Sequence, residues 1–310
     1  MKKRTKIRHP IELLDVIKTF FVGIFSFLAV APLILIFAVS ITDENSITRN
    51  GFRFIPEVFS LEAYRQIFAT NPHPATAADF IGGSMLLNSY LVSIAVTTSG
   101  TLIAVCITFM AAYALNNRSL KIRNGLALYF YFTMLFAPGI VPVFLMTQRL
   151  GLINTFGALL VPYLLFSPFN LFLMRNYMRG VPEALMESAK LDGANDVQIA
   201  FRIFLPVCKP IIAVVALFHA INYWNDWFNA IMFVDNHSLY PLQFLLFRIQ
   251  ADIRALQMVQ NITGIVGRSP MPAQGVQMAT VIVTLGPILF LYPYLQKYFM
   301  KGLVIGSVKG

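Results

Sequence analysis

The sequence predicts an all-α membrane protein with six transmembrane helices and with both termini on the cytoplasmic side. Three observations lead to this prediction. Of the 310 residues, 57% are hydrophobic and 12% are charged, which is about half the charged fraction of a typical soluble domain. The apolar residues come in long runs without charge, and most of the 24 Lys and Arg residues lie between alternate runs, as the positive-inside rule requires.

Each expected span is an apolar run of about 20 residues or more, the length that a helix needs to cross a bilayer. Charged residues set the bounds: Lys18 and Asp43 enclose the first run, and Arg123, Arg149 and Arg175 enclose the third and the fourth. The six expected spans are about residues 19–42, 86–113, 124–148, 150–174, 210–234 and 274–296.

The second span lies in a charge-free stretch from residue 80 to 117, the fifth contains Asp226 alone, and the sixth ends at Lys297. An even number of spans places both termini on one side. Cationic residues concentrate before the first span and after the second, the fourth and the sixth, so these segments are predicted to be cytoplasmic. The prediction gives a cytoplasmic segment 1–18, a transmembrane domain 19–296 with a cytoplasmic loop 175–209, outer loops 43–84 and 235–273, and a cytoplasmic tail 297–310.

Several kinds of function are disfavoured. The net charge of +10 would suggest nucleic acid in a soluble protein, but here membrane topology explains it. Cys106 and Cys208 form no disulfide framework, and the four His residues have no metal-ligand spacing. No phosphate-binding loop is present, and we see no cleavable signal peptide. We therefore expect no catalytic site, metal or cofactor in this chain.

The cytoplasmic loop 175–209 carries strong local signals. Pro182 and Glu183 suit the start of a helix, Gly193 can end it in a left-handed conformation, and Asn195 can cap a second helix, which Pro206 closes. Two short helices are thus predicted to meet at a rigid bend. An exposed apolar helix in this place indicates either a docking surface or a helix lying on lipid headgroups.

A longer motif resembles a known signature. The order is Glu187-Ser188-Ala189, three residues, Gly193, nine residues, Ile203, one residue, Leu205-Pro206. It resembles the EAA loop of ABC importer permeases and differs only in Ser188, where the signature has Ala. The resemblance implies a coupling helix that sits in a cleft of a separate ATPase subunit. The implied coupling residues are Glu183, Glu187, Ser188, Ala189, Asp192, Gly193, Ile203, Leu205 and Pro206.

Polar and aromatic residues gather in the fifth span. They are His219, Asn222, Tyr223, Trp224, Asn225, Asp226 and Asn229. In a continuous helix, His219, Asn222, Asp226 and Asn229 would fall within an arc of about 80°. Amides and aromatic rings suit a sugar pathway. An aromatic belt with hydrogen bonds between helices is the alternative.

The run from residue 222 to 229, residues 240–243 and the tail resemble the carbohydrate-uptake permeases, in particular the maltose and oligosaccharide branch. The resemblance implies a five-helix permease core with one extra N-terminal helix, in the plasma (inner) membrane of a prokaryote. It also implies four kinds of partner: a second homologous permease, two ATPase subunits that bind ATP and Mg²⁺, an extracytoplasmic sugar-binding protein, and a carbohydrate substrate.

Two other functions remain open from the sequence. An ABC permease for a peptide or amino acid would share the EAA loop but not the polar and aromatic run. An ion-driven secondary transporter often shows internal repeats and intramembrane ionisable residues. This chain shows no obvious halved repeat and a single charge within its expected spans.

Overall fold

The computed structural model describes residues 13–69, 85–263 and 274–285. Regular structure in these ranges is helical, and the only β-type contact described is an isolated bridge between Thr42 and Phe59. The predicted all-helical class is therefore confirmed. By contact clustering, the chain forms two compact units, Met1–Ile67 with Gln257–Val283, and Phe68–Leu256 with Thr284–Gly310.

The first unit begins with α1 (Leu13–Ser40), a helix of 28 residues. Its stretch Asp15–Ser40 is long and apolar enough to cross a membrane. Phe20, Phe25 and Phe27 are each about two-thirds exposed. A long helix with such exposed apolar side chains suits a lipid environment.

Two short helices follow in this unit, α2 (Glu44–Asn50) and α3 (Glu62–Ala69). The carboxylate of Glu44 accepts hydrogen bonds from the backbone N–H groups of Gln274 (3.0 Å) and Gly275 (2.9 Å). These two residues open the helix Gln274–Leu285. An acidic group here satisfies free N–H groups and complements the helix dipole.

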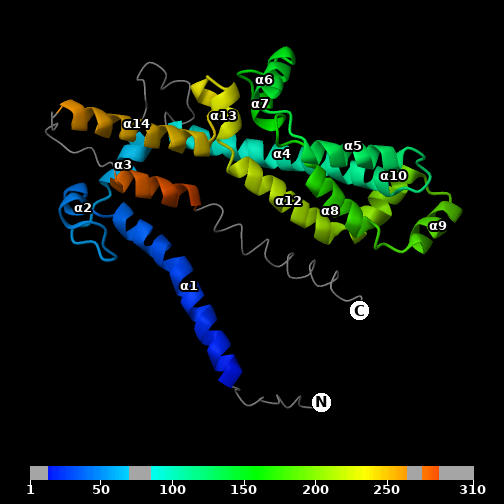
Figure 1. The fold of residues 1–310 in the computed structure, drawn as a ribbon, viewed down its shortest axis with the longest axis horizontal. Coiled ribbons are helices and arrows are strands. Elements are labelled where there is room, and N and C mark those ends of the chain that lie inside the picture. Colours follow the sequence, from blue (N-terminus) through cyan, green and yellow to red (C-terminus); the bar gives the residue numbers. More distant parts are fainter. Residues whose placement is uncertain (1–12, 70–84, 264–273, 286–310) are drawn as a thin grey trace. The chain divides into compact units, whose positions relative to one another are not determined.

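The second unit is built around α4 (Met85–Asn116), a helix of 32 residues. Both α8 (Pro168–Met178) and α12 (Lys209–Trp224) pack along it (Figure 1). The closest approach is at Gly100, where an added Cβ would lie 2.5 Å from Cζ of Tyr223. Small residues allow such close helix packing.

The expected third span is bent. Residues 124–148 fall in α5 (Arg123–Leu135) and α6 (Ile140–Arg149), whose axes differ by 116°. Pro138 and Gly139 stand at the break, and Gly139 has a positive φ of 82°. A left-handed residue beside a proline ends one helix and redirects the chain.

The expected fourth and fifth spans are not single helices either. Residues 150–174 contain α7 (Phe156–Leu160) and most of α8, with no regular helix in residues 161–167. The fifth span breaks after α12 and resumes as α13 (Phe228–Phe233). Other elements are α9 (Glu183–Leu191), α10 (Asp196–Ile199), a π-helical turn (Ala200–Phe204), α11 (Leu205–Val207), a 3-10 turn (His237–Leu239) and α14 (Leu242–Thr263).

Two helices in the described ranges could cross a membrane alone, Asp15–Ser40 and Met85–Asn116. Two bent pairs raise the number to four: α5 with α6, and Asp196–Val207 with α12, which are bent by 83°. The fold is thus helical and of membrane type. The count of six spans and the sidedness of the termini remain predictions, and the end of the sixth span lies outside the described residues.

Candidate functional site

The predicted first helix of the cytoplasmic loop is present as α9. Pro182 is its N-cap residue, and Glu183 lies in its first turn. Gly193 follows the helix with a φ of 84°. Its N–H donates to the carbonyl of Lys190, and the N–H of Ala194 donates to the carbonyl of Ala189. This pair of bonds is a Schellman motif, so the predicted left-handed stop at Gly193 is confirmed.

One side of α9 is anchored and the other is free. Ala189 is 8% exposed and belongs to the hydrophobic core, against which Met186 also packs. Leu191 is 89% exposed. Of the other coupling residues implied by the motif, Glu183, Glu187, Ser188, Asp192, Gly193 and Pro206 are exposed, whereas Ile203 and Leu205 are half-buried. The helix therefore presents a solvent-facing surface while its inner edge holds it to the unit.

The second helix begins as predicted at Asn195. Its side chain accepts from the N–H of Gln198 at 2.8 Å, and the Gln198 side chain accepts from the N–H of Asn195 at 3.0 Å. This is a complete capping box. α10 then passes through the π-helical turn into α11, which ends at Val207, one residue after Pro206. A bend of 83° leads from there into α12, so α9 and α12 are joined by short, capped elements.

The polar residues of the fifth span do not share one continuous helix face. α12 ends at Trp224 and α13 begins at Phe228. Asp226 lies in this break, where its Oδ1 accepts from the N–H groups of Phe228 (3.1 Å) and Asn229 (3.2 Å). The carboxylate thus caps the first turn of α13. The arc that assumed an unbroken helix is therefore wrong beyond Trp224.

Other members of this group hold helices together. His219 is buried, with its Nε2 3.1 Å from Nδ2 of Asn170 on α8. Asn229 is buried as well and donates from Nδ2 to the carbonyl of Pro162 at 2.9 Å. The Tyr223 hydroxyl donates to the carbonyl of residue 160 at 2.8 Å. The contacts of His219 and Tyr223 fit the alternative of hydrogen bonds between helices, and that of Asn229 joins α13 to the non-helical stretch 161–167.

Two side-chain amides of this group are exposed. The Asn222 side chain is exposed and makes no hydrogen bond within the described residues. Asn225 is exposed too; it donates to the carbonyl of Ile221 at 3.0 Å and accepts from Nε2 of Gln243 at 3.4 Å. Trp224 is buried, and its indole N–H has no partner in the described ranges. The substrate-pathway role of these residues stays a prediction.

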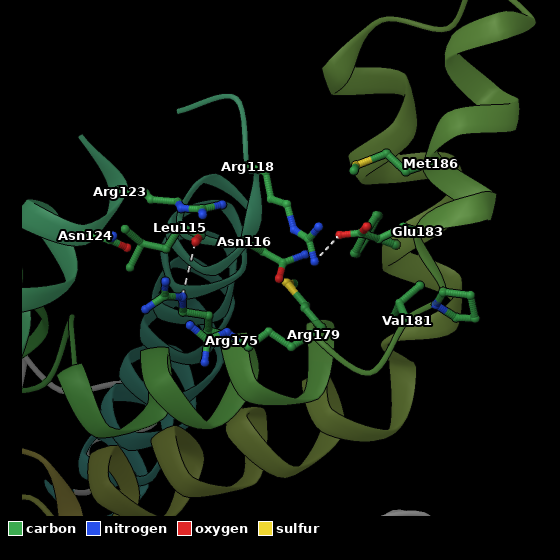
Figure 2. Close-up of a pocket in the computed structure, with 13 residues that line it drawn as sticks. Leu115, Asn116, Arg118, Arg123, Asn124, Arg175, Arg179, Val181, Glu183 and Met186 are labelled. Carbon is green, nitrogen blue, oxygen red and sulfur yellow. Dashed lines mark hydrogen bonds and ion pairs between the residues drawn. The ribbon is translucent and has the colours of Figure 1, made fainter. Parts of the chain in front are cut away.

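A cavity of about 340 Å³ lies between α9 and the ends of α4, α5 and α8 (Figure 2). Four arginines line it: Arg118, Arg123, Arg175 and Arg179. Burial, with Arg179 and Arg123 adding to it, lowers the pKa of Arg175 from its usual value. The sequence reasoning missed this site because it used the four residues only as markers of topology. The spacing of Arg175 and Arg179 by four residues on one helix was the available signal.

The described residues contain no group of three or more His, Cys, Asp or Glu side chains placed to hold a metal ion.

Comparison with known proteins finds a matching family and similar transport proteins. Residues 104–304 match the family described as binding-protein-dependent transport system inner membrane component. The chain is 37% identical to the polygalacturonan/rhamnogalacturonan transport system permease protein YtcP of Bacillus subtilis over 96% of this chain and 99% of that protein. It is 36% identical to the protein LplC of the same organism, with coverages of 96% and 95%.

A solved structure is also similar. It is a chain of a bacterial ABC transporter involved in the import of the acidic polysaccharide alginate, with a TM-score of 0.78 and 27% sequence identity. The similarity covers 95% of this chain and 100% of that chain.

Proposed function

This chain belongs to the family of binding-protein-dependent transport system inner membrane components and is a permease of the carbohydrate ABC importer type. From that premise we propose that it forms half of the membrane pathway of an oligosaccharide importer. A separate ATPase drives it through the EAA loop. The observation that carries the proposal is the solvent-exposed surface of α9. This helix stops before Gly193 and is joined to α12 by short capped elements.

The coupling step follows from this arrangement. ATPase subunits that close on ATP and Mg²⁺ would move α9, whose buried Ala189 ties it to the unit's core. Movement passes through α10 and α11 into α12, because these segments contain no long flexible loop. α12 in turn packs along α4. The chain itself performs no covalent chemistry in this proposal.

The proposed assembly contains four kinds of subunit. A second homologous permease completes the pathway, two ATPase subunits lie on the cytoplasmic side, and an extracytoplasmic sugar-binding protein delivers the substrate. The proposed topology has six spans with cytoplasmic termini. The distribution of Lys and Arg supports this sidedness, and the two long apolar helices with the two bent pairs are compatible with it.

Asn222 and Asn225 are the proposed substrate contacts of this chain, because their amides are exposed, whereas His219 and Asn229 are buried and Asp226 is half-buried. Amide groups can both donate to and accept from sugar hydroxyls. No Lys or Arg lies in residues 210–234, so a carboxylate on an acidic sugar would meet no cationic side chain within this segment. Uptake competition with galacturonate and galactose oligosaccharides of equal length would separate acidic from neutral substrates.

Co-purification tests the proposal. The tagged chain is extracted in mild detergent, and the retained proteins are identified by mass spectrometry. We expect a second permease and an ATPase. Glu187→Lys should reduce ATPase recovery about tenfold, which corresponds to about 1.4 kcal/mol, while Asp235→Lys, the same charge reversal at another exposed position, should leave it unchanged. Recovery of this chain alone would overturn the proposal.

A further inference from the structure

The arginine-lined cavity has an unusual balance of charge. Among the described residues on its wall, Glu183 alone is acidic, and its Oε1 lies 2.6 Å from Nη2 of Arg118 (Figure 2). Among the described residues, Arg123, Arg175 and Arg179 form no ion pair. Three positive charges, on the buried Arg175, the half-buried Arg123 and the exposed Arg179, therefore line one cavity without a paired carboxylate among the described residues.

The rest of the chain offers few acids that could supply one. Of its 14 Asp and Glu residues, only Glu12 and Asp79 lie outside the described ranges. Asp79 falls in the predicted outer loop, and residues 286–310 contain neither Asp nor Glu. Among the described residues no carboxylate pairs with these three arginines, so they are free to pair with an anion from outside this polypeptide.

Arg175 has hydrogen-bond donors that lack an acceptor. Its side chain is buried, at 7% exposure, and its Nε donates to the carbonyl of Leu115 at 3.2 Å. That bond satisfies the C-terminal end of α4, but its two Nη groups have no acceptor among the described residues. These Nη groups are therefore free donors at the wall of the cavity. A ligand with several acceptor oxygens would pair with them.

We propose that this cavity binds the phosphate group of an anionic phospholipid, such as phosphatidylglycerol. Arginine pairs with phosphate through two parallel hydrogen bonds, and basic pockets on the cytoplasmic side of membrane proteins suit anionic headgroups. The wall also contains apolar side chains with accessible surface, those of Val181, Pro182 and Met186, which suit an amphiphilic ligand better than a free ion. The assignment to the membrane boundary rests on the proposed topology.

The test is lipid retention measured by native mass spectrometry. The full chain, with the subunits it retains, is purified in micelles containing equal amounts of phosphatidylglycerol and phosphatidylcholine. Wild-type protein should retain phosphatidylglycerol in preference. Arg123→Gln with Arg179→Gln should reduce that preference about tenfold. This double variant keeps Arg175 and its hydrogen bond to Leu115 of α4. The matched control, Arg149→Gln with Arg202→Gln, removes two exposed arginines that do not line the cavity and should retain the preference.

Three results would overturn the proposal. Equal retention of the two lipids by wild-type protein would show that the cavity does not select an anionic headgroup. Displacement of phosphatidylglycerol by millimolar inorganic phosphate would identify a free-anion site. Loss of the lipid when the ATPase is bound, together with cross-linking of Arg179→Cys to that subunit, would assign the cavity to a protein carboxylate. The measurement uses neither ATP nor sugar, so its failure would leave the transport proposal intact.

Discussion

At the scale of single residues, two glycines are required for opposite reasons. An added Cβ at Gly193 would meet nothing within 4 Å, but its φ of 84° is one that side-chain-bearing residues rarely adopt. At Gly100 the limit is space, because three ring atoms of Tyr223 lie between 2.5 and 2.7 Å from the position of an added Cβ. Substitutions at Gly193 should therefore be detected as a loss of transport, and substitutions at Gly100 as a loss of thermal stability.

Variants of Gly193 should lose coupling in a graded order. Asn reaches the left-handed region readily, Ala pays about 1–2 kcal/mol there, and Pro cannot adopt it. Sugar uptake in vesicles should fall from wild type through Asn and Ala to none with Gly193→Pro, with equal amounts of protein in the membrane. Gly151→Ala is the control, since Gly151 also has a positive φ of 68° in open space but lies outside the loop. Normal uptake by Gly193→Pro would remove the coupling role.

Gly100→Ala should destabilise the packing of α12 on α4. The Tyr223 ring cannot retreat freely, because its hydroxyl is bonded to the carbonyl of Leu160. Overpacking of this kind costs about 1–3 kcal/mol, and we expect a lower midpoint of thermal unfolding in detergent. Gly125→Ala in α5, where an added Cβ meets nothing within 4 Å, should leave the midpoint unchanged or raise it. An unchanged midpoint for Gly100→Ala would contradict the packing seen here.

At the scale of elements, the proposed coupling requires a stiff connection from α9 to α12. The capping box at Asn195 fixes the start of α10, and the π-helical turn, α11 and the bend of 83° follow without a loop. Inserted flexible residues would lengthen this connection without touching the exposed surface of α9.

Two glycines inserted between Val207 and Cys208 should separate ATPase binding from transport. We expect the ATPase to co-purify as with wild type, because α9 is unchanged, and sugar uptake to fall about tenfold or more. The same insertion between Phe54 and Ile55, an exposed stretch of the first unit, should leave uptake near normal. Normal uptake after the insertion at Val207 would show that this connection does not transmit movement.

Elements were predictable from sequence where the signal is local. The stop at Gly193 and the cap at Asn195 depend on neighbouring residues, and both are confirmed. Runs of apolar residues predicted where helices lie but not their breaks, because hydropathy does not register the left-handed Gly139 or the break at residues 225–227. The arginine cavity joins α8 to the start of α5 and to α9, and no local pattern predicts contacts between such distant segments.

At the scale of the whole molecule, sidedness is the property that most needs measurement. The proposed topology places the α9 loop inside and the segment between α2 and α3 outside. Leu191 and Ile55 report these two places well, since they are 89% and 80% exposed.

Single cysteines should therefore be labelled from opposite sides. With Cys106 and Cys208 replaced by Ala, Leu191→Cys should react with a membrane-impermeant maleimide only in inside-out vesicles. Ile55→Cys should react only in right-side-out vesicles. Vesicles opened with detergent serve as the control for reactivity. Labelling of both from the same side would contradict the charge-based orientation.

The hydrogen bonds of Glu44 also order events during biosynthesis. Its two donors, Gln274 and Gly275, lie about 230 residues later in the chain. A ribosome adding about 5–20 residues per second needs roughly 10–50 seconds to make that interval. Until then the carboxylate has neither donor, and the helix that it caps does not exist. The unit that contains α1 is thus completed only when the helix Gln274–Leu285 has begun to emerge.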